Sequence, residues 1–403
     1  MSSYYAGSVD RVLRSRLLEP ASIGTLGILL GIFAFIVTIP PLTSRTLTWS
    51  LLAGVLAILC GVVSLSRGAT RAGWGAVATG VLGMLLGELA TRSSVGNLDQ
   101  VFTASLIASM LVFATPLTFA AIGGMFSERS GVVNIGLEGM MLMGAFWGIW
   151  GANKTDSWQL GVLIAMASGG LLALVHAFFA IHLRADQIVG GTAVNFLALG
   201  ITGYFFVQLY HGENVPTGIP QIPTVNLAKS GSHSFWANSF GHLNLMIWVA
   251  IILVPLSYVV MFKTPVGLRI RACGEHPRAA DTVGINVYLV RYLSVVLSGM
   301  LAAAGGAYLT VGYLNTFNEN VTAGRGFIAL AALIFGNWRP FGAFGAALLF
   351  GFSTALAFRL PVYLESAATL FQALPYVLTL IAVAGVIGRT VPPAAVGRPY
   401  KKQ

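Results

Sequence analysis

The sequence predicts an all-α, polytopic membrane protein, and three observations support this fold class. Of the 403 residues, 56% are hydrophobic and only 9% are charged, whereas soluble domains carry about 25% charged residues. The mean hydropathy is +0.81. Twelve apolar segments have lengths near the 20 residues that cross a bilayer as a helix. These features exclude a soluble enzyme, a nucleic-acid-binding domain and a disordered chain.

The twelve predicted spans follow one another along the chain. They cover residues 21–40, 49–65, 72–90, 104–124, 137–151, 158–182, 190–210, 243–262, 287–312, 321–335, 342–358 and 366–388. The first apolar run is too long for an ordinary secretory signal peptide, so we expect a retained helix. The spans at 137–151 and 321–335 are short and flanked by glycine. Interrupted segments at matching positions of two halves are typical of a translocation pathway.

The basic residues predict the orientation. With the N-terminus inside, 17 of the 23 lysines and arginines fall in inside segments and 6 in outside segments. Because basic residues mark cytoplasmic loops, we expect both termini in the cytoplasm. The tail from Val391 contains two prolines, and we expect it to be loose. Cys60 lies in an apolar run and Cys273 in a basic loop, so the two cysteines do not predict a disulfide.

A weak internal repeat relates two groups of four spans, 104–210 and 287–388. Asn134–Gly148 and Thr322–Gly336 can be laid side by side without gaps. The shared positions are Gly136/Gly324, Leu142/Leu330 and Gly148/Gly336. Three identities in sequence rich in Gly and Leu can also arise by chance. The charge argument gives the two groups opposite orientations, and inverted repeats are typical of transporters.

Polar residues near the two short spans are candidates for the substrate pathway. Asn134 and Glu138 are four residues apart, which predicts a shared helix face. A buried carboxylate in a membrane is functional or paired by default, here with Arg129 or Arg325. The alternative is a helix cap with a surface salt bridge. Asn195, in the seventh span, either hydrogen-bonds a substrate or holds helices together.

The mirrored stretch 315–320 is predicted to face outside. Its Asn315, Phe317 and Asn318 suit a neutral polar ligand with an aromatic or sugar part, and they equally suit an ordinary loop. The candidate pathway residues are therefore Asn134, Glu138, Asn195, Asn315, Phe317 and Asn318.

The long inside loop 263–286 predicts a short amphipathic helix. Gly274-Glu275-His276-Pro277 begins it, since an acidic residue and a proline suit a first turn, and Gly284 ends it. Such a helix can present its outer side to another protein, or it can bind lipid headgroups alone. The sequence contains no G-x-x-x-x-G-K-[ST] motif, so we do not expect the chain to bind ATP through a P-loop. No His/Cys cluster has metal-ligand spacing.

Two motif blocks carry a family resemblance. The stretches ERSGVVNIGLEGMMLMGAF and GEHPRAADTVGINVYLVRYLSVVLSGMLAAAGGAYL resemble permeases of bacterial ABC importers of the branched-chain amino acid/ribose/nucleoside type. They are most similar to the nucleoside branch, which depends on BMP lipoproteins. The resemblance covers roughly residues 100–390. The family core has about ten spans, which implies a cytoplasmic segment at 1–20, additional helices at 21–71, a permease core at 72–390 and a cytoplasmic tail at 391–403.

The resemblance implies a non-enzymatic subunit of a nucleoside importer in the bacterial inner membrane. The implied partners are a cytoplasmic ABC ATPase that binds ATP and Mg, a second homologous permease chain, an extracellular substrate-binding lipoprotein and membrane lipid, but no nucleic acid. The chain itself is expected to bind no cofactor or metal. By the family's pattern, 131–148 and 315–336 are the broken, pore-lining segments. The coupling helix to the ATPase comprises Glu275, His276, Pro277, Arg278, Ala279, Ala280, Asp281 and Gly284.

Three alternative functions remain at this point. The same fold can import a sugar or a branched-chain amino acid. An ion-coupled secondary transporter would need a buried acid–base relay, for which Glu88 and Glu138 are the only candidates. The third alternative is a membrane-embedded interaction subunit that transports nothing.

Overall fold

The computed structural model describes residues 19–37, 47–91, 103–213, 218–228, 234–360 and 390–401, together with Ala373 and Tyr376, and these are mostly helical. The N-terminal helices are α2 (Pro20–Ile36), α3 (Leu47–Ser66) and α4 (Thr70–Thr91). The elements of the first half are α6 (Ala104–Arg129), α7 (Leu137–Thr155), α8 (Trp158–Ala177), the π-helix η1 (Phe178–His182) and α9 (Gln187–Tyr210). The connecting elements are β1 (Thr224–Asn226), α10 (Phe235–Phe240), β2 (His242–Asn244), α11 (Leu245–Lys263), α12 (Pro265–Glu275) and α13 (Pro277–Thr282). The second half contains α14 (Val287–Ala307), the π-helix η2 (Tyr308–Leu314), α15 (Arg325–Phe335) and α16 (Pro340–Arg359).

A helix occupies each predicted span from the first to the eleventh. The twelfth, 366–388, lies outside the described residues apart from Ala373 and Tyr376. Within the described part of the chain, seven helices are long and apolar enough to cross a membrane. The chain is therefore a multi-pass membrane protein.

The spanning helices bury small residues and expose large apolar ones. On α3, Ala57 is fully buried, whereas Leu52 and Leu59 are more than half exposed. Without water to drive apolar surfaces together, membrane helices associate by close packing of small residues. The leucine faces are then left to contact lipid acyl chains.

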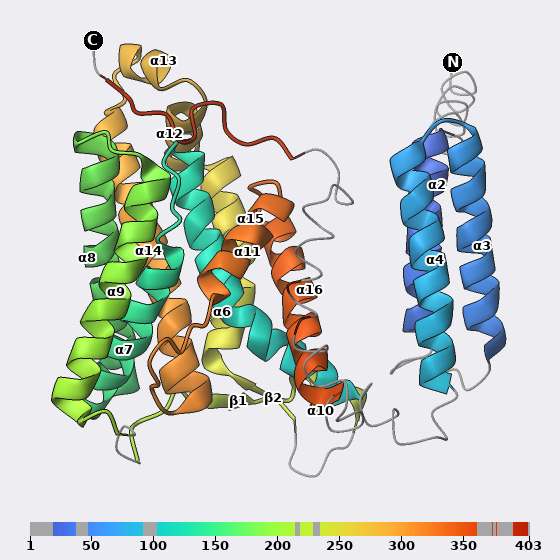
Figure 1. The fold of residues 1–403 in the computed structure, drawn as a ribbon, viewed down its shortest axis with the longest axis horizontal. Coiled ribbons are helices and arrows are strands. Elements are labelled where there is room, and N and C mark those ends of the chain that lie inside the picture. The colour runs from blue at the N-terminus through green and yellow to red at the C-terminus, as the bar shows by residue number, and fades with distance from the viewer. Residues whose placement is uncertain are drawn as a thin grey trace, which may run out of the picture.

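The helices α2, α3 and α4 pack mainly against one another (Figure 1). A Cβ on Gly83 of α4 would lie 2.2 Å from the backbone oxygen of Gly31 of α2, so the helices pack backbone to backbone. The sequence analysis assigned α4 to the permease core. In the structure, α4 forms a three-helix unit with the two helices that precede it.

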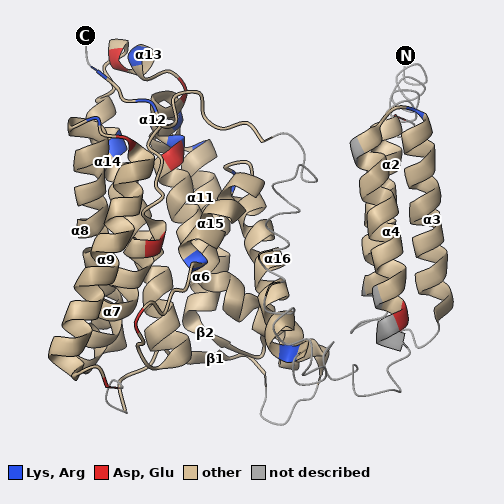
Figure 2. Cartoon of the chain, in the orientation of Figure 1, with Lys and Arg blue, Asp and Glu red and all other residues tan. Residues whose placement is uncertain are grey.

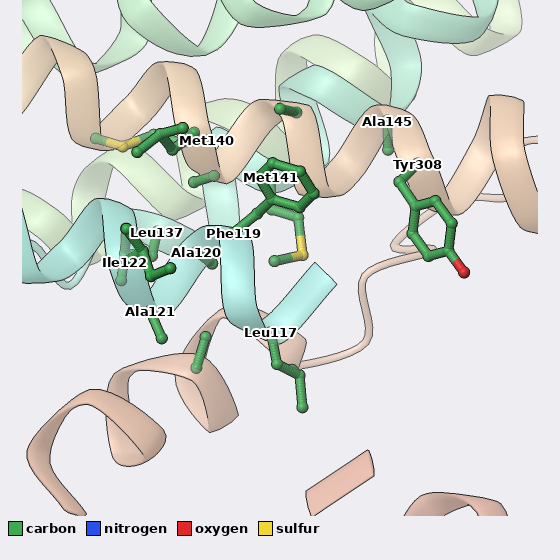
Figure 3. Close-up of a cluster of buried hydrophobic side chains, with 14 of the residues drawn as sticks. Leu117, Phe119, Ala120, Ala121, Ile122, Leu137, Met140, Met141, Ala145 and Tyr308 are labelled. Carbon is green, nitrogen blue, oxygen red and sulfur yellow. The ribbon is translucent and has the colours of Figure 1, made fainter. Parts of the chain in front are cut away.

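The core of the larger unit lies between α6, α7 and α14. Its fully buried side chains include Ile122, Met140, Met141, Phe146 and Tyr308. Figure 3 shows part of this cluster, in which Met141 and Phe119 lie between neighbouring helices. Glycines allow the closest approaches: a Cβ on Gly306 of α14 would lie within 2 Å of the Met141 carbonyl oxygen of α7.

The packing of the two halves follows a repeated scheme. Helix α8 packs against α14 as α16 packs against α6, and α7 packs against α14 as α15 packs against α6. The end of α6 and the start of α14 both approach α12, so α6 and α14 run in opposite directions. This scheme is the one that two inverted repeats around an α6–α14 pair would produce.

A small β-hairpin, which the sequence analysis did not predict, closes the end of the bundle opposite α12. The strands β1 and β2 pair antiparallel, with Thr224 opposite Asn244. The side-chain amide of Asn244 donates to the carbonyl oxygens of Ile222 and Gly312, each at 3.0 Å. The hairpin is thereby attached to η2.

The other end of the bundle carries α12, α13 and many of the charged residues (Figure 2). The prediction of a helix ending before Gly284 is confirmed, because α13 ends at Thr282 and Gly284 has φ +84°. The prediction that Glu275 begins this helix is wrong. Glu275 is the last residue of α12, and α13 begins at Pro277 after a break at His276.

The expectation of a loose C-terminal tail is also wrong for the described residues 390–401. Ala395 and Tyr400 are each only 6% exposed. In Figure 1 this last part of the chain, drawn in dark red, crosses α12 and ends beside α13. Its backbone is hydrogen-bonded to the loops beneath it.

Candidate functional site

The two interrupted helices meet inside the bundle, at Glu138 of α7 and the start of α15. One oxygen of the Glu138 carboxylate accepts hydrogen bonds from the Thr322 hydroxyl at 2.5 Å and the Gly324 amide at 2.8 Å. The other accepts from the Gly326 amide at 2.6 Å. The first amides of a helix have no partner within the helix and carry partial positive charge. Glu138, only 7% exposed, therefore caps α15 from another helix.

Asn195 of α9 caps the break in the first half. Its side-chain oxygen accepts from the Gly139 amide at 2.8 Å, and its side-chain nitrogen donates to the Ile135 carbonyl at 3.0 Å. Both ends of the amide are therefore engaged with the backbone around the start of α7. This geometry favours the prediction that Asn195 holds helices together.

Asn134 lies in the break between α6 and α7. The prediction that it shares a helix face with Glu138 is wrong, because α7 begins only at Leu137. Its side-chain nitrogen donates to the hydroxyl of Ser298 on α14 at 2.9 Å. Its side-chain oxygen is buried without a hydrogen-bond partner. The break is thus hydrogen-bonded to α14, and the side-chain oxygen of Asn134 remains an unused acceptor.

Two backbone amides and the Thr322 hydroxyl, rather than the two arginines proposed from the sequence, donate hydrogen bonds to Glu138. Arg129 lies 3.9 Å from the carboxylate of Glu275, at the end of the bundle that carries α12. Arg325 donates to the carbonyl oxygens of Val321 and Thr322 at 2.9 and 3.1 Å. Since three hydrogen bonds already hold the Glu138 carboxylate, an acid–base relay through it has no structural support. Glu88 lies on α4 in the separate three-helix unit.

The remaining predicted pathway residues are not grouped around Glu138. Phe317 is fully buried, with its ring centroid 5.1 Å from that of Phe146 and 5.3 Å from that of Phe206. Asn318 is exposed on the loop after η2. Asn315 lines a cavity of about 200 Å³ together with Gln221 and other residues of the hairpin side.

A second cavity of about 410 Å³ lies beside the start of α15. Arg325, Thr354, Phe358 and Tyr376 are among its lining residues. The sequence analysis considered Arg325 only as a partner of Glu138 and missed the other three. A cation next to a glycine-rich helix start was the one signal that could have pointed to this cavity.

The loop between α11 and α14 presents α13 at the surface. Arg278, Ala279 and Thr282 are exposed, and Val283 is 74% exposed, whereas Ala280 is buried. Beneath α13, α12 packs closely on the end of α6: a Cβ on Gly274 would lie 2.1 Å from the Arg129 carbonyl oxygen. The exposed helix α13 is therefore connected through α12 to the residues that precede the first break.

A buried contact that the sequence analysis missed joins the end of α6 to the turn between α15 and α16. The Trp338 indole nitrogen donates to the Glu128 carboxylate at 2.5 Å, and Arg129 Nε donates to the Trp338 carbonyl at 3.0 Å. Glu128 is 4% exposed and Trp338 5% exposed. A carboxylate at the end of an apolar span was the only sequence signal for this contact.

Helices that are interrupted at corresponding places and meet inside a spanning bundle are the mark of membrane transport proteins. Comparison with protein families makes the assignment more specific. Residues 106–383 match the family described as "Branched-chain amino acid transport system / permease component". The chain belongs to this family.

Curated relatives match the chain over most of their own length. It is 44% identical to the guanosine ABC transporter permease protein NupQ of Bacillus subtilis over 313 residues, which cover 74% of this chain and 96% of the relative. It is 40% identical to the nucleoside ABC transporter permease protein NupC of Lactococcus lactis, with the same coverage. The putative glucose ABC transporter permease protein TsgC13 of Haloferax volcanii is 36% identical over 262 residues, 64% of this chain and 78% of the relative. No solved structure gives a significant match.

Proposed function

We propose that the chain is the transmembrane permease subunit of an ATP-driven importer and forms a pathway for nucleosides across the bacterial plasma membrane. One observation carries this proposal. Two relatives named for guanosine or nucleoside transport are 44% and 40% identical over 96% of their lengths. The family membership supports the role as a permease component.

The proposal includes the partner subunits. A cytoplasmic ABC ATPase that binds ATP and Mg supplies the energy, a second permease chain completes the pathway and an extracellular lipoprotein delivers the substrate. Both termini lie in the cytoplasm, and the twelve predicted spans all cross the membrane. The helices α2, α3 and α4 form an accessory unit, because they pack on one another and precede the matched residues 106–383.

The geometry suggests how the ATPase drives the pathway. The ATPase binds the exposed side of α13 and displaces it together with α12. Because α12 packs against the end of α6, the displacement reaches the break at 130–136 and then Glu138, which caps α15. Movement of one repeat against the other then opens the pathway alternately to the two sides.

Uptake of radiolabelled guanosine tests the proposal, in cells that lack this chain and are complemented with variants. Arg278→Glu with Val283→Asp changes one exposed side chain of α13 and the exposed residue that follows this helix, and the control Lys154→Glu reverses an exposed charge at the far end of α7. We expect wild type and the control to restore uptake. The rate of guanosine uptake should be at least tenfold lower for the α13 variant than for wild type. The variant should still reach the membrane in normal amounts.

Other outcomes identify the alternatives. Restoration of radiolabelled glucose or leucine uptake, without restoration of guanosine uptake, would assign the chain to a sugar or an amino acid; the similarity to a putative glucose permease makes glucose the first of these substrates to test. Uptake that persists without the ATPase under an ion gradient would indicate a secondary transporter. Full activity of the α13 variant would overturn the coupling assignment.

A further inference from the structure

The described part of the C-terminal tail, residues 390–401, binds across the surface that carries α12 and α13; we call it the C-terminal strap. We propose that this strap is a positioning element for ATP coupling: it holds α12 and α13 in fixed relation to the break between α6 and α7. The inference rests on the proposed role of α13 in binding the ATPase. It concerns residues outside the matched family region, which ends at 383.

Backbone hydrogen bonds join the strap to α12. The Ala395 amide donates to the Gly274 carbonyl at 2.9 Å, and the Ala394 amide donates to the Glu275 carboxylate at 3.1 Å. Gly274 and Glu275 are the last residues of α12, directly before α13. The strap therefore binds at the joint between the two helices.

The same strap binds the loop that follows α6. The Gly397 amide donates to the Gly131 carbonyl at 3.2 Å. Further along the surface, the Val391 amide donates to the side-chain oxygen of Asn337, in the turn between α15 and α16. One short segment is thus bonded to α12, to the first break and to the second half of the bundle.

Arg291 of α14 fixes the strap from below. Its guanidinium is 1% exposed and donates to the Ser130 carbonyl at 3.1 Å and to the Arg398 carbonyl at 3.3 Å. A buried charge is retained only where it is hydrogen-bonded. Gly131, at φ +98°, leaves the space for it, because a Cβ there would lie 2.6 Å from a guanidinium nitrogen. Arg291 is therefore a joint anchor of the break and the strap.

Tyr400 closes the contact on the α13 side. Its ring lies 5.6 Å from that of Tyr288, and it packs in one buried cluster with Cys273 of α12 and Ala280 of α13. Cys273 is fully buried in this cluster. The exposure of its thiol consequently reports whether the strap is in place.

These contacts make α12, α13 and the first break move together. The short helix α13 and the joint at His276 have few contacts of their own beyond α12 and α14. If the strap were released, ATPase-driven displacement of α13 could be absorbed at His276 instead of reaching residues 130–136. The expected defect is therefore a loss of coupling, with ATP hydrolysis retained and transport reduced.

The experiment uses the complete transporter in inside-out vesicles, in a Cys60→Ser background so that Cys273 is this chain's only thiol. The variants are Tyr400→Ala, Tyr400→Phe, a chain ending after residue 389, and the control Lys401→Ala, which changes the exposed neighbouring residue. Maleimide labelling of Cys273, guanosine uptake and ATP hydrolysis are each normalised to the amount of protein in the membrane.

We expect Cys273 to be labelled at least tenfold faster in Tyr400→Ala and in the truncated chain than in wild type. The uptake of guanosine per ATP hydrolysed should be at least fivefold lower in both. Tyr400→Phe retains the ring and loses only the hydroxyl that contacts Asp281 of α13, so it should lie much closer to wild type than Tyr400→Ala. Lys401→Ala should behave like wild type. If Tyr400→Ala labels as slowly as the control, or labels fast but transports normally per ATP, the inference is overturned. If the truncated chain does not reach the membrane, the comparison of Tyr400→Ala with Tyr400→Phe decides.

The labelling result is independent of the substrate. A wild-type transporter that takes up no guanosine contradicts the proposed function, whereas the difference in Cys273 labelling still shows whether the strap holds α12. A transporter that takes up guanosine but couples normally without the strap contradicts only this inference.

Discussion

Glu138 and Gly326, which the predicted repeat pairs with one another, are in direct contact. The ungapped pairing of 134–148 with 322–336 places them opposite one another. In the structure, the Glu138 carboxylate accepts from the Gly326 amide at 2.6 Å, and a Cβ on Gly326 would lie 2.4 Å from the Glu138 Cα. The starts of α7 and α15 therefore pack directly on one another inside the bundle.

This contact makes the two repeats chemically unequal. In the first half the equivalent residue is a carboxylate, and in the second it is a glycine whose amide needs an acceptor. The carboxylate replaces the water that would otherwise solvate the start of α15 inside the membrane. The same hydrogen bonds join α7 of the first half to the start of α15 in the second half.

The capping role of Glu138 predicts a specific mutational pattern. Glu138→Ala removes the acceptor of two buried donors, from Thr322 and Gly326, and of the partly buried Gly324 amide, and each unpaired buried donor costs about 1–3 kcal/mol. We expect a destabilisation of about 3 kcal/mol or more, measured as a fall in the thermal unfolding midpoint in detergent. Glu138→Gln, which retains one acceptor oxygen, should fall between Ala and wild type.

The control for this prediction is Asn318→Ala, on the exposed loop after η2, which should change the midpoint little. If Glu138 carried protons, the result would differ. Glu138→Gln would then fold like wild type and abolish uptake.

The close approach at Gly326 predicts a steric effect. Gly326→Ala must push α7 and α15 apart, because the new methyl group would overlap the Glu138 backbone. Overpacking of this kind costs about 1–3 kcal/mol, and we expect lower thermal stability together with loss of guanosine uptake. Gly345→Ala, on α16 with open space around it, is the matched control and should be neutral. Normal uptake by Gly326→Ala would contradict the close contact.

The helical fold could be read largely from the sequence, because lipid-facing helices are continuous apolar runs and their length is set by the bilayer. The two short spans and the end of α13 before Gly284 were also predictable, since glycine marks helix ends locally. The β-hairpin and the packing of the C-terminal strap were not. Both depend on hydrogen bonds between residues far apart in the chain, such as Ala395 with Gly274.

The candidate site was predicted only in part. Glu138 stood out because a carboxylate in an apolar run needs a partner. Its partners are backbone amides of Gly324 and Gly326, and no side-chain pattern reveals which amides are free. The expected arginine was therefore right in part: Arg325 attracts Glu138 electrostatically but hydrogen-bonds to Val321 and Thr322, and Arg129 lies next to Glu275 instead. Phe317 illustrates the opposite case, since a buried aromatic and a ligand-stacking aromatic look alike in sequence.

The contacts of Asn195 predict that it acts on structure and not on substrate binding. Asn195→Ala removes both hydrogen bonds to the start of α7, and we expect a loss of about 1–3 kcal/mol of stability. The amount of transporter in the membrane should fall while the KM for guanosine stays unchanged. Measuring KM and membrane abundance together separates the two roles. A tenfold rise in KM at normal abundance would make Asn195 a substrate contact.

The buried pair of Glu128 and Trp338 predicts a second stability effect, at the C-terminal end of α6. Trp338→Phe keeps an aromatic ring but removes the indole N–H that donates to the carboxylate. Leaving this buried acceptor with one donor fewer should cost about 1–3 kcal/mol, seen as a lower unfolding midpoint. Trp236→Phe, at a position that is 69% exposed, should leave the midpoint unchanged. Equal midpoints for the two variants would show that the hydrogen bond contributes nothing.

The burial of Cys273 predicts slow thiol chemistry in the folded transporter. Burial raises the pKa of this thiol from its ordinary value near 9 to about 11, although the nearby Arg291 guanidinium opposes the shift. The thiolate is the reactive form, so a pKa two units higher lowers its population at pH 7.5 about a hundredfold. Because folding favours the neutral thiol, its burial contributes stability that is fully present below the ordinary pKa near 9. This stability is lost as the pH rises through the folded-state pKa of about 11. We expect maleimide labelling of Cys273 in a Cys60→Ser chain to be at least a hundredfold slower in the folded transporter than after denaturation at the same pH. Equal rates would show that the thiol is exposed.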